Sequence, residues 1–303
     1  LLDLLSHPQK ILSIITTELK DLKTKYADDR RTKVIKQGLG QFSEKDLIPK
    51  KDVLITITKT GYIKCLPPGT YRAQHRGGKG VMGMTTKDED EIAHLTSAST
   101  HDTIFLFTDK GRVFALKAYE IPETSRTAKG QAIINLINIE QKEEVQAMLT
   151  TGSDLATATS EYLIMATQSG MIKKTKLQAF KNIRSSGIRA IHLSSTDRLI
   201  WVKQTHGTDH IMIIAQSGKA IKFHEKDVRS SGRNTKGVRG IHVKPEDKVV
   251  AMVNFPAEIP PTVGRKKPFR DLLVVTERGL GKRTAVAEFP LHHRGGVGVK
   301  AAE

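Results

Sequence analysis

The sequence predicts an all-β, propeller-like protein preceded by a short N-terminal α-helix. Three observations lead to this prediction. Helical periodicity is confined to about the first 30 residues, apolar residues alternate from about residue 50 onward, and a strand with a glycine turn then recurs five times. Repeats of roughly 50 residues with about four strands each are typical of propellers, in which every repeat forms one blade.

The first segment has the pattern of an amphipathic helix. Five apolar residues recur at spacings of three or four, which places them on one helix face: Ile11, Ile15, Leu19, Leu22 and Tyr26. Ser6 and Gln9 suggest a capping box, and Pro8 is tolerated in a first turn. We expect residues 1–40 to hold this helix and a polar linker, and residues 41–303 to form the β-domain.

Each of the five repeats opens with a short apolar strand that leads into a glycine turn. The expected strands cover residues 53–57, 103–107, 162–165, 210–214 and 272–275, and the turns end at Gly61, Gly111, Gly170, Gly218 and Gly279. A glycine at such a place suits the positive φ of a tight hairpin. Further strands are expected near 91–95 and 248–252, and residues 255–268 are expected to form an exposed insertion.

A basic motif, Arg-x-x-Lys-Gly, recurs in register after these turns. Fifteen residues after the turn glycine, four repeats carry Arg, and nineteen residues after it four carry Gly, which Lys precedes in three. The members are Arg76, Arg126, Arg233 and Arg294, then Lys79, Lys129 and Lys236, then Gly80, Gly130, Gly237 and Gly298. The third repeat has Arg184 one position early, and Arg189, Arg229 and Arg239 lie beside these loops.

This motif suits a phosphate-binding rim. A repeat array places equivalent loops around one edge, where Arg can bind phosphate through two N–H groups and Lys supplies a point charge. The glycines would let the main chain approach a phosphodiester closely. Seven other cations follow the turns on the strands and fit equally well a solvated strand face: Lys64, Lys117, Lys173, Lys174, Lys222, Lys282 and Arg283.

The overall charge agrees with a polyanionic partner. The chain has 49 Lys and Arg against 32 Asp and Glu, a formal net charge of +17. Nucleic acid, an acidic membrane surface or an acidic protein would suit such a charge. The few aromatic residues lie mostly on strands, which favours contacts to duplex phosphates over stacking with single strands.

Several other classes of site are excluded or disfavoured. The single cysteine, Cys65, permits neither an internal disulfide nor a cysteine-rich zinc site, and we expect it to be a small buried hydrophobe. No apolar run approaches the ~18 residues of a membrane span. His292 and His293 lack a third metal ligand, and residues 88–91 are expected to form a solvated acidic loop or to balance the charge of the basic rim. We expect no catalytic residue, cofactor or metal in this segment.

The first repeat resembles a known family. Gln74, His75, Arg76, Gly77, Gly78, Lys79 and Gly80 resemble the gyrase A box, the heptad Gln-Arg-Arg-Gly-Gly-Lys-Gly of DNA gyrase A subunits, with His75 as the departure. Residues 230–240 and 281–288 are similar to later repeats of that family, and the leading helix is similar to the end of its breakage-reunion core. The resemblance covers nearly the whole chain.

The resemblance implies a β-pinwheel, a propeller-like ring whose neighbouring blades exchange strands. It implies duplex DNA binding without sequence preference, with chiral wrapping around the rim. The ATP-dependent holoenzyme, a type II DNA topoisomerase, would then introduce negative supercoils. The resemblance also implies a homodimer of the full gyrase A protein that pairs with the gyrase B protein (A2B2), Mg²⁺ and ATP used elsewhere in the holoenzyme, and a bacterial cytoplasmic, nucleoid-associated location.

Two alternatives remain open. The chain could be the corresponding domain of topoisomerase IV, whose counterpart of the gyrase A protein has a degenerate box, or a basic propeller that binds acidic protein partners. Six blades are expected from the family where five repeats are visible, so we expect the β-domain to be truncated at its C-terminal end; the alternative is a ring with fewer blades.

Overall fold

The computed structural model describes residues 6–28, 47–70, 90–152, 162–257 and 271–301. The chain divides into two compact units, Leu1–Leu47 and Ile48–Glu303. The first contains the predicted helix and the second contains the strands, and each is described by itself below.

Helix α2 (Pro8–Tyr26) confirms the helical prediction, and its side chains are all solvent-accessible. The predicted capping box is wrong. The N-cap residue is His7, which makes no side-chain cap bond, and the Ser6 hydroxyl instead lies 2.9 Å from Nδ1 of His7. Pro8 occupies the first turn, where its missing N–H costs no helical hydrogen bond. In the described part of the chain, no helix combines the length and the apolar character that a membrane crossing needs.

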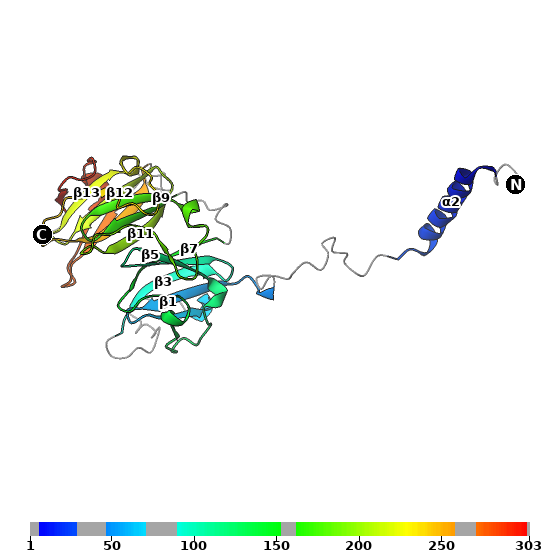
Figure 1. The fold of residues 1–303 in the computed structure, drawn as a ribbon, viewed down its shortest axis with the longest axis horizontal. Coiled ribbons are helices and arrows are strands. Elements are labelled where there is room, and N and C mark those ends of the chain that lie inside the picture. The colour runs from blue at the N-terminus through cyan, green and yellow to red at the C-terminus, as the bar shows by residue number, and fades with distance from the viewer. Residues whose placement is uncertain (1–5, 29–46, 71–89, 153–161, 258–270, 302–303) are drawn as a thin grey trace. The chain divides into compact units, whose positions relative to one another are not determined.

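The second unit is built from antiparallel sheets, and we call each sheet a blade (Figure 1). Blade 1 contains β3 (Ile92–Ser99), β1 (Asp52–Thr58), β2 (Tyr62–Leu66) and β6 (Gln131–Ala132). Blade 2 contains β7 (Val145–Thr151), β4 (Thr103–Thr108), β5 (Arg112–Lys117) and β10 (Ile188–Arg189). Blade 3 contains β11 (Leu199–Thr205), β8 (Tyr162–Thr167), β9 (Met171–Lys176) and β14 (Val238–Arg239). Blade 4 contains β15 (Val249–Pro256), β12 (Asp209–Ala215), β13 (Lys219–His224) and β18 (Val299–Lys300). Blade 5 consists, among the described residues, of β16 (Asp271–Val275) and β17 (Gly281–Ala285).

Neighbouring blades exchange strands. The fourth strand of each complete blade belongs to the following repeat: β6 pairs with β2, β10 with β5, β14 with β9, and β18 with β13. The predicted count of four strands per blade is therefore confirmed, and the strand exchange that defines a β-pinwheel is present.

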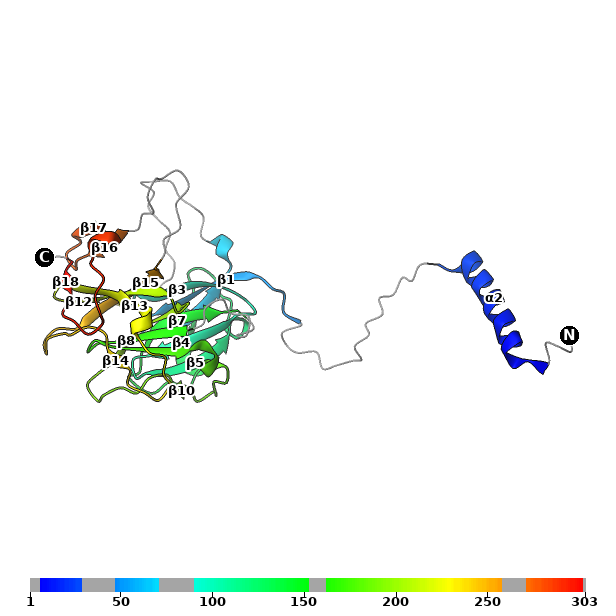
Figure 2. The same ribbon diagram turned by 90° about the horizontal axis from the view of Figure 1, so that it is seen from above.

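The order of the strands separates an inner from an outer edge. Strands β3, β7, β11 and β15 are neighbours from blade to blade, and all four line one cavity of about 900 Å³. The exchanged strands form the opposite edge of each sheet, and Figure 2 shows β10, β14 and β18 at the periphery of the unit. The loops that lead into the exchanged strands therefore lie on the outer rim.

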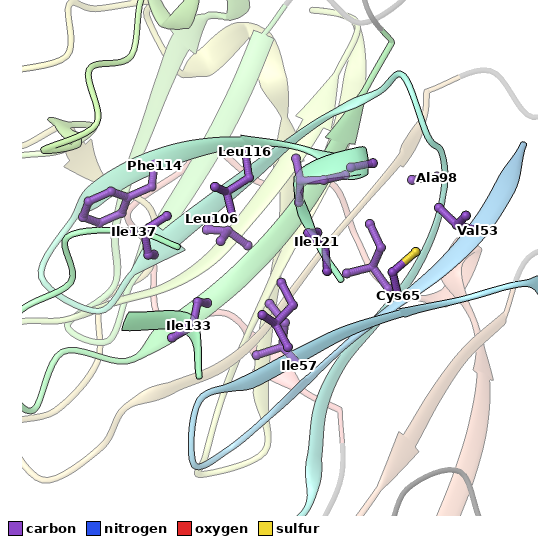
Figure 3. Close-up of a cluster of buried hydrophobic side chains, with 14 residues drawn as sticks. Val53, Ile57, Cys65, Ala98, Leu106, Phe114, Leu116, Ile121, Ile133 and Ile137 are labelled. Carbon is purple, nitrogen blue, oxygen red and sulfur yellow. The ribbon is translucent and has the colours of Figure 1, made fainter. Parts of the chain in front are cut away.

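The hydrophobic core lies between the blades. One cluster joins blades 1 and 2, with Ile57 and Cys65 on one side facing Leu106 and Phe114 on the other (Figure 3). Three further clusters repeat this packing between blades 2 and 3, 3 and 4, and 4 and 5. Each blade thus buries apolar side chains against its neighbours, as repeat architectures require.

The five turn glycines have the predicted backbone conformation. Their φ values lie between 74° and 87°, in the region that suits glycine. A second device that sequence reasoning missed fixes three of these turns: Asp90, Asp197 and Asp247 accept hydrogen bonds from the hydroxyl and main-chain N–H of Thr60, Ser169 and Ser217, respectively.

Two local predictions need correction. Asp90 is buried in the turn contact rather than solvated, and Glu91 pairs with Lys59 at 2.7 Å. The expected insertion starts too early, because Phe255 and Pro256 belong to β15 and Phe255 is buried. Residues 88–89 and 258–270 lie outside the described residues.

Candidate nucleic-acid interface

Four outer loops are described, and we number them after their repeats: loop 2 (residues 121–130), loop 3 (181–187), loop 4 (228–237) and loop 5 (289–298). Each starts after a short 3₁₀-helix and ends at the glycine before an exchanged strand. Loops 2, 4 and 5 run parallel to a strand of the preceding blade through the bridges Cys65–Glu123, Lys174–Ser230 and Lys222–Leu291. The candidate heptad of the first repeat (Gln74, His75, Arg76, Gly77, Gly78, Lys79 and Gly80) lies outside the described residues.

The glycines that end loops 2, 4 and 5 pack against the preceding blade. Gly130, Gly237 and Gly298 have φ of 82°, 83° and 79°, and a Cβ on Gly130 would lie 2.5 Å from the carbonyl oxygen of Ile63. Equivalent collisions would occur at Gly237 with Ile172 and at Gly298 with Ala220. Close approach to the preceding blade, rather than the predicted approach to a phosphodiester, accounts for glycine at these three positions.

The third repeat keeps this glycine two residues earlier than predicted. Gly187 has φ of 71° and directly precedes β10, and a Cβ there would lie 2.7 Å from the Phe114 ring. The apparent exception in the third repeat is therefore a shorter loop with the same ending.

The candidate cations divide into two groups. Arg184, Arg189, Arg229, Lys236 and Arg239 are exposed, whereas Arg126, Lys129, Arg233 and Arg294 are half-buried. In the second group, the ammonium of Lys129 lies 3.7 Å from the centre of the Tyr62 ring. Nε and Nη1 of Arg294 donate to the carbonyls of Asp227 and Arg239 at 2.9 and 3.2 Å. Arg294, predicted to bind phosphate, is thus also engaged in holding loop 4.

Neighbouring loops are joined into a continuous row. The His192 N–H donates to the carbonyl of Thr235 in loop 4 at 3.1 Å, and the His242 N–H donates to Gly296 in loop 5 at 2.8 Å. A third bond runs from the Gly295 N–H to the carbonyl of Gly240 at 2.7 Å. The exposed cations of loops 3 and 4 and of the exchanged strands β10, β14 and β18 therefore sit on one connected backbone, which we call the outer row.

Two exposed cations of this row were missed, Lys181 in loop 3 and Lys300. Lys300 is the second residue of β18, where Arg189 and Arg239 stand in β10 and β14. Counting from the turn glycine hides this equivalence because the loops differ in length. Counting from the glycine that precedes each exchanged strand would have found it.

Four of the strand lysines are withdrawn from the surface instead. Lys64, Lys173 and Lys174 are buried, Lys222 is half-buried, and each ammonium donates to at least one main-chain carbonyl of the neighbouring repeat. Burial lowers the pKa of Lys173 to about 8, with a further contribution from the nearby charge of Arg233. Burial also lowers the pKa of Lys222, and burial followed by the charge of Arg126 lowers that of Lys64. Neither a solvated strand face nor a phosphate contact describes these side chains.

The remaining strand cations lie nearer the surface. The Lys117 ammonium donates to the Thr103 hydroxyl at 2.8 Å, Lys282 is exposed, and Arg283 pairs with Asp271 at 2.8 Å.

A buried carboxylate joins blades 3 and 4. Glu225 is fully buried and accepts hydrogen bonds from the Thr205 hydroxyl at 2.7 Å and from the main-chain N–H groups of Gly207 and Asp209 at 3.1 Å. The ammonium of Lys174 lies 3.6 Å from the same carboxylate. Such a group is tolerated in the interior because its oxygens are paired.

Two other sequence features take simple roles. Cys65 is buried, as predicted, and burial with the nearby Glu123 raises the pKa of its thiol to about 11. His293 is exposed and lies 3.5 Å from the Asp227 carboxylate. Across the described ranges, no three potential metal-ligating side chains come together.

This geometry defines a class of protein: a strand-exchanging β-propeller with a connected row of cationic loops on its outer rim. Residues 52–99, 102–151, 161–206, 209–256 and 270–303 match the family model for the DNA gyrase C-terminal domain, described as a β-propeller. The chain therefore belongs to the family of DNA gyrase C-terminal domains.

Individual relatives agree with this assignment. The chain is 40% identical over 300 residues to the DNA gyrase A protein of Staphylococcus epidermidis and 39% identical over 297 residues to that of Haloquadratum walsbyi. These matches cover 99% and 98% of this chain but 32% and 34% of the relatives. The chain thus spans about a third of the length of these proteins.

Two solved structures are similar. One is a DNA gyrase A C-terminal domain, with 29% identity and a TM-score of 0.65 over 82% of this chain and 76% of that one. The other is a DNA topoisomerase IV C-terminal domain, with 28% identity and the same TM-score over 84% and 73%. The fold alone does not separate the two classes, whereas the family model and the curated relatives favour gyrase.

Proposed function

We propose that this domain binds duplex DNA along the outer row, without reading base sequence, and bends it around the rim as part of a DNA gyrase. The observation that carries this proposal is the connection of loops 3, 4 and 5 into one row that bears exposed cations. Phosphate contacts by Arg and Lys supply affinity that does not depend on sequence.

We assign the phosphate contacts to the exposed cations Arg184, Arg189, Arg229, Lys236, Arg239 and Lys300, and to the half-buried Arg126, Lys129, Arg233 and Arg294. The candidate heptad from Gln74 to Gly80 would extend this set on the first repeat. His75 differs from the basic residue of the gyrase A box, so Arg76 and Lys79 carry the charge there at neutral pH.

The wider activity belongs to the same proposal. The bend would be a chiral wrap that lets a type II topoisomerase introduce negative supercoils. ATP and Mg²⁺ would act elsewhere in an A2B2 holoenzyme formed with the gyrase B protein, in the bacterial cytoplasm at the nucleoid. Residues 1–40 would be the end of the breakage-reunion core with its linker.

The free-energy cost of bending DNA explains why a row of loops is needed. Bending roughly 40 bp of DNA through half a turn costs on the order of 10 kcal/mol by elastic estimate. One loop cannot offset this cost, but a row of about five loops that neutralises on the order of 10 phosphates can. A plot of the logarithm of the binding constant against the logarithm of the salt concentration should then have a slope of about −9.

A topological experiment tests the proposal. The chain is incubated with relaxed closed circular DNA, a nicking-closing enzyme is added, and the change in linking number is read on a gel. A positive shift per bound protein supports chiral wrapping. Binding without a shift contradicts wrapping, and preference for an acidic protein over duplex DNA would favour the alternative partner.

A double variant separates wrapping from binding. We expect Arg76→Ala with Lys79→Ala to abolish the linking-number shift before it abolishes binding, because the other loops supply general affinity. Loss of all binding in this double variant would contradict that division between the loops.

A further inference from the structure

The position three residues after the turn glycine alternates along the chain. It is Lys64 in the first repeat, Phe114 in the second, Lys173 in the third and Ile221 in the fourth. The loop of the next repeat alternates with it. Loops 2 and 4, which follow the lysines, contain the full Arg-x-x-Lys-Gly motif, whereas loops 3 and 5 keep the arginine but lack the motif's lysine.

Lys64 reaches from blade 1 into loop 2. Its buried ammonium donates to the carbonyl of Arg126 at 2.6 Å and to that of Ala128 at 3.0 Å. The end of the loop is fixed on the same stretch of strand, because Gly130 packs against the main chain of Ile63 and the Cβ of Lys64. The two carbonyls belong to the motif's arginine and to the residue before its lysine.

Lys173 repeats this arrangement one blade pair further on. Its ammonium donates to the carbonyl of Arg233 in loop 4, and Gly237 packs against Ile172 and the Cβ of Lys173. A second bond, 2.7 Å long, runs to the carbonyl of Ala190, directly after β10. Lys173 therefore joins the end of one exchanged strand to the next loop of the outer row.

The other two loops are seated by different contacts. The Phe114 ring lies against Gly187, while Arg112 donates from its Nη2 to the carbonyl of Ser186 at 3.1 Å. In loop 5, the side chain of Ile221 lies at van der Waals distance from the Cβ position of Gly296. A buried ammonium under the loop is thus seen where the loop carries both an arginine and a lysine.

We propose that Lys64 and Lys173 are positioning residues for duplex DNA binding. Each holds the main chain of the following Arg-x-x-Lys-Gly loop in the conformation from which its two cationic side chains reach phosphates. This inference rests on the proposed function. The lysines themselves touch no DNA, since both are buried beneath the loops they hold.

The lysines position the loops because they supply hydrogen-bond donors to the loop carbonyls. With the ammonium removed, the carbonyls of Arg126 and Ala128, or of Arg233, lose a buried donor, and a buried acceptor without a partner is unfavourable. The loop can restore its hydrogen bonds by moving out to water, which displaces both of its cations. The fold can survive, because the exchanged strands and the clusters between blades remain.

Lys173→Met tests this in the 303-residue chain, because methionine keeps an unbranched, apolar stem without the donor. The matched control is Lys222→Met, since Lys222 also lies on a blade strand with a pKa lowered by burial, but donates to Val286 outside the motif. The double variant Arg233→Ala with Lys236→Ala sets the full loss expected when loop 4 contributes no charge. Binding to a fluorescent duplex of about 60 bp is measured between about 50 and 200 mM salt, together with the melting temperature.

We expect Lys173→Met to lower the affinity roughly tenfold and to reduce the magnitude of the salt slope by about 1.8, the loss of two phosphate contacts. Lys222→Met should lower the melting temperature with little change in affinity or slope. Equal melting losses in the two methionine variants, with DNA binding unchanged in both, would overturn the inference and leave Lys173 a structural residue.

Three further outcomes can be distinguished. If Lys173→Met does not fold, Lys64→Met repeats the experiment in blade 1, where the same loss of slope is expected and an unchanged slope would overturn the inference. If the unaltered chain shows no salt-dependent duplex binding, the proposed function itself is wrong. If Arg233→Ala with Lys236→Ala lowers the slope but Lys173→Met does not, only the positioning role is wrong.

Discussion

Replacement of Gly237 by alanine should damage the rim more than any other glycine change within loop 4. Gly237 combines a φ of 83° with a Cβ position that collides with the Ile172 carbonyl and lies 2.9 Å from the Cβ of Lys173. A side chain at positive φ costs about 1–2 kcal/mol. Forcing a methyl group against a main chain adds about 1–3 kcal/mol, so we expect a loss of about 3 kcal/mol in the free energy of unfolding.

Two other glycines separate these contributions. Gly279 has a φ of 79° and open space around its Cβ position, so Gly279→Ala should cost about 1 kcal/mol from backbone strain alone. Gly232 lies in the same loop as Gly237, has open space and no positive φ, so Gly232→Ala should be neutral or stabilising by up to about 1 kcal/mol.

Thermal unfolding followed by circular dichroism gives the order of the three variants. At about 2–4 °C per kcal/mol for a domain of this size, Gly237→Ala should melt about 6–12 °C below the unaltered chain. It should also weaken duplex binding, because loop 4 must lift from blade 3 to admit the methyl group. If Gly237→Ala had the same melting temperature as Gly232→Ala, the close packing of Gly237 against blade 3 would be refuted.

Three further predictions follow from buried charges. Folded Lys173 begins to lose its proton near pH 8, whereas the same lysine in the unfolded chain keeps its proton to higher pH. The free energy of unfolding should therefore rise by about 1 kcal/mol between pH 8 and 9. Urea denaturation measures this rise, which should be absent in Lys173→Met. Above pH 9 the raised pKa of Cys65 acts in the opposite direction, so a continued rise at full slope to pH 11 would contradict this assignment. Glu225→Gln should cost about 3 kcal/mol in the same assay, whereas Glu91→Gln, which breaks only an exposed ion pair, should change stability little. The pKa of Asp247 is lowered: burial alone would raise it, but hydrogen bonds from Ser217 and Lys248 outweigh that effect. Stability should therefore fall as pH drops through 3.8 toward the lowered value, and less in Asp247→Asn.

The parts of the fold that depend on neighbouring residues could be predicted from the sequence. A strand, a glycine turn and a second strand form a hairpin through local geometry, so Gly61 and Gly170 were found with their positive φ. The repeat length then predicted blades, because each hairpin needs neighbours to bury its faces.

The exchanged strands could not be found this way. Each has only two residues, as in Val238–Arg239, and two residues carry no alternating pattern. Their existence depends on a glycine that packs on the preceding blade, a contact between residues such as Gly237 and Ile172 that are far apart in the sequence. Sequence reasoning saw the glycine and assigned it to phosphate.

The buried lysines show a similar limit. A lysine on a strand normally indicates a solvated face, and only the carbonyls of the next loop make Lys64 and Lys173 acceptable in the interior. One signal was available. Phe114 and Ile221 occupy the same position in the second and fourth repeats, and an apolar equivalent marks a buried site. The cations of the outer row are exposed, as a phosphate-binding role requires. Their contacts with DNA remain predictions.

A rim that bends DNA must itself resist bending, because otherwise the protein would deform to fit a straight duplex. Blades 3 and 4 are held together by contacts of four kinds. These are an apolar cluster, the pairing of β14 with β9, the hydrogen bond from Lys173 to Arg233 and the buried contacts of Glu225. Rotation of one blade against the next would break several of these contacts at once, so under the proposed function the cost of curvature would fall on the DNA.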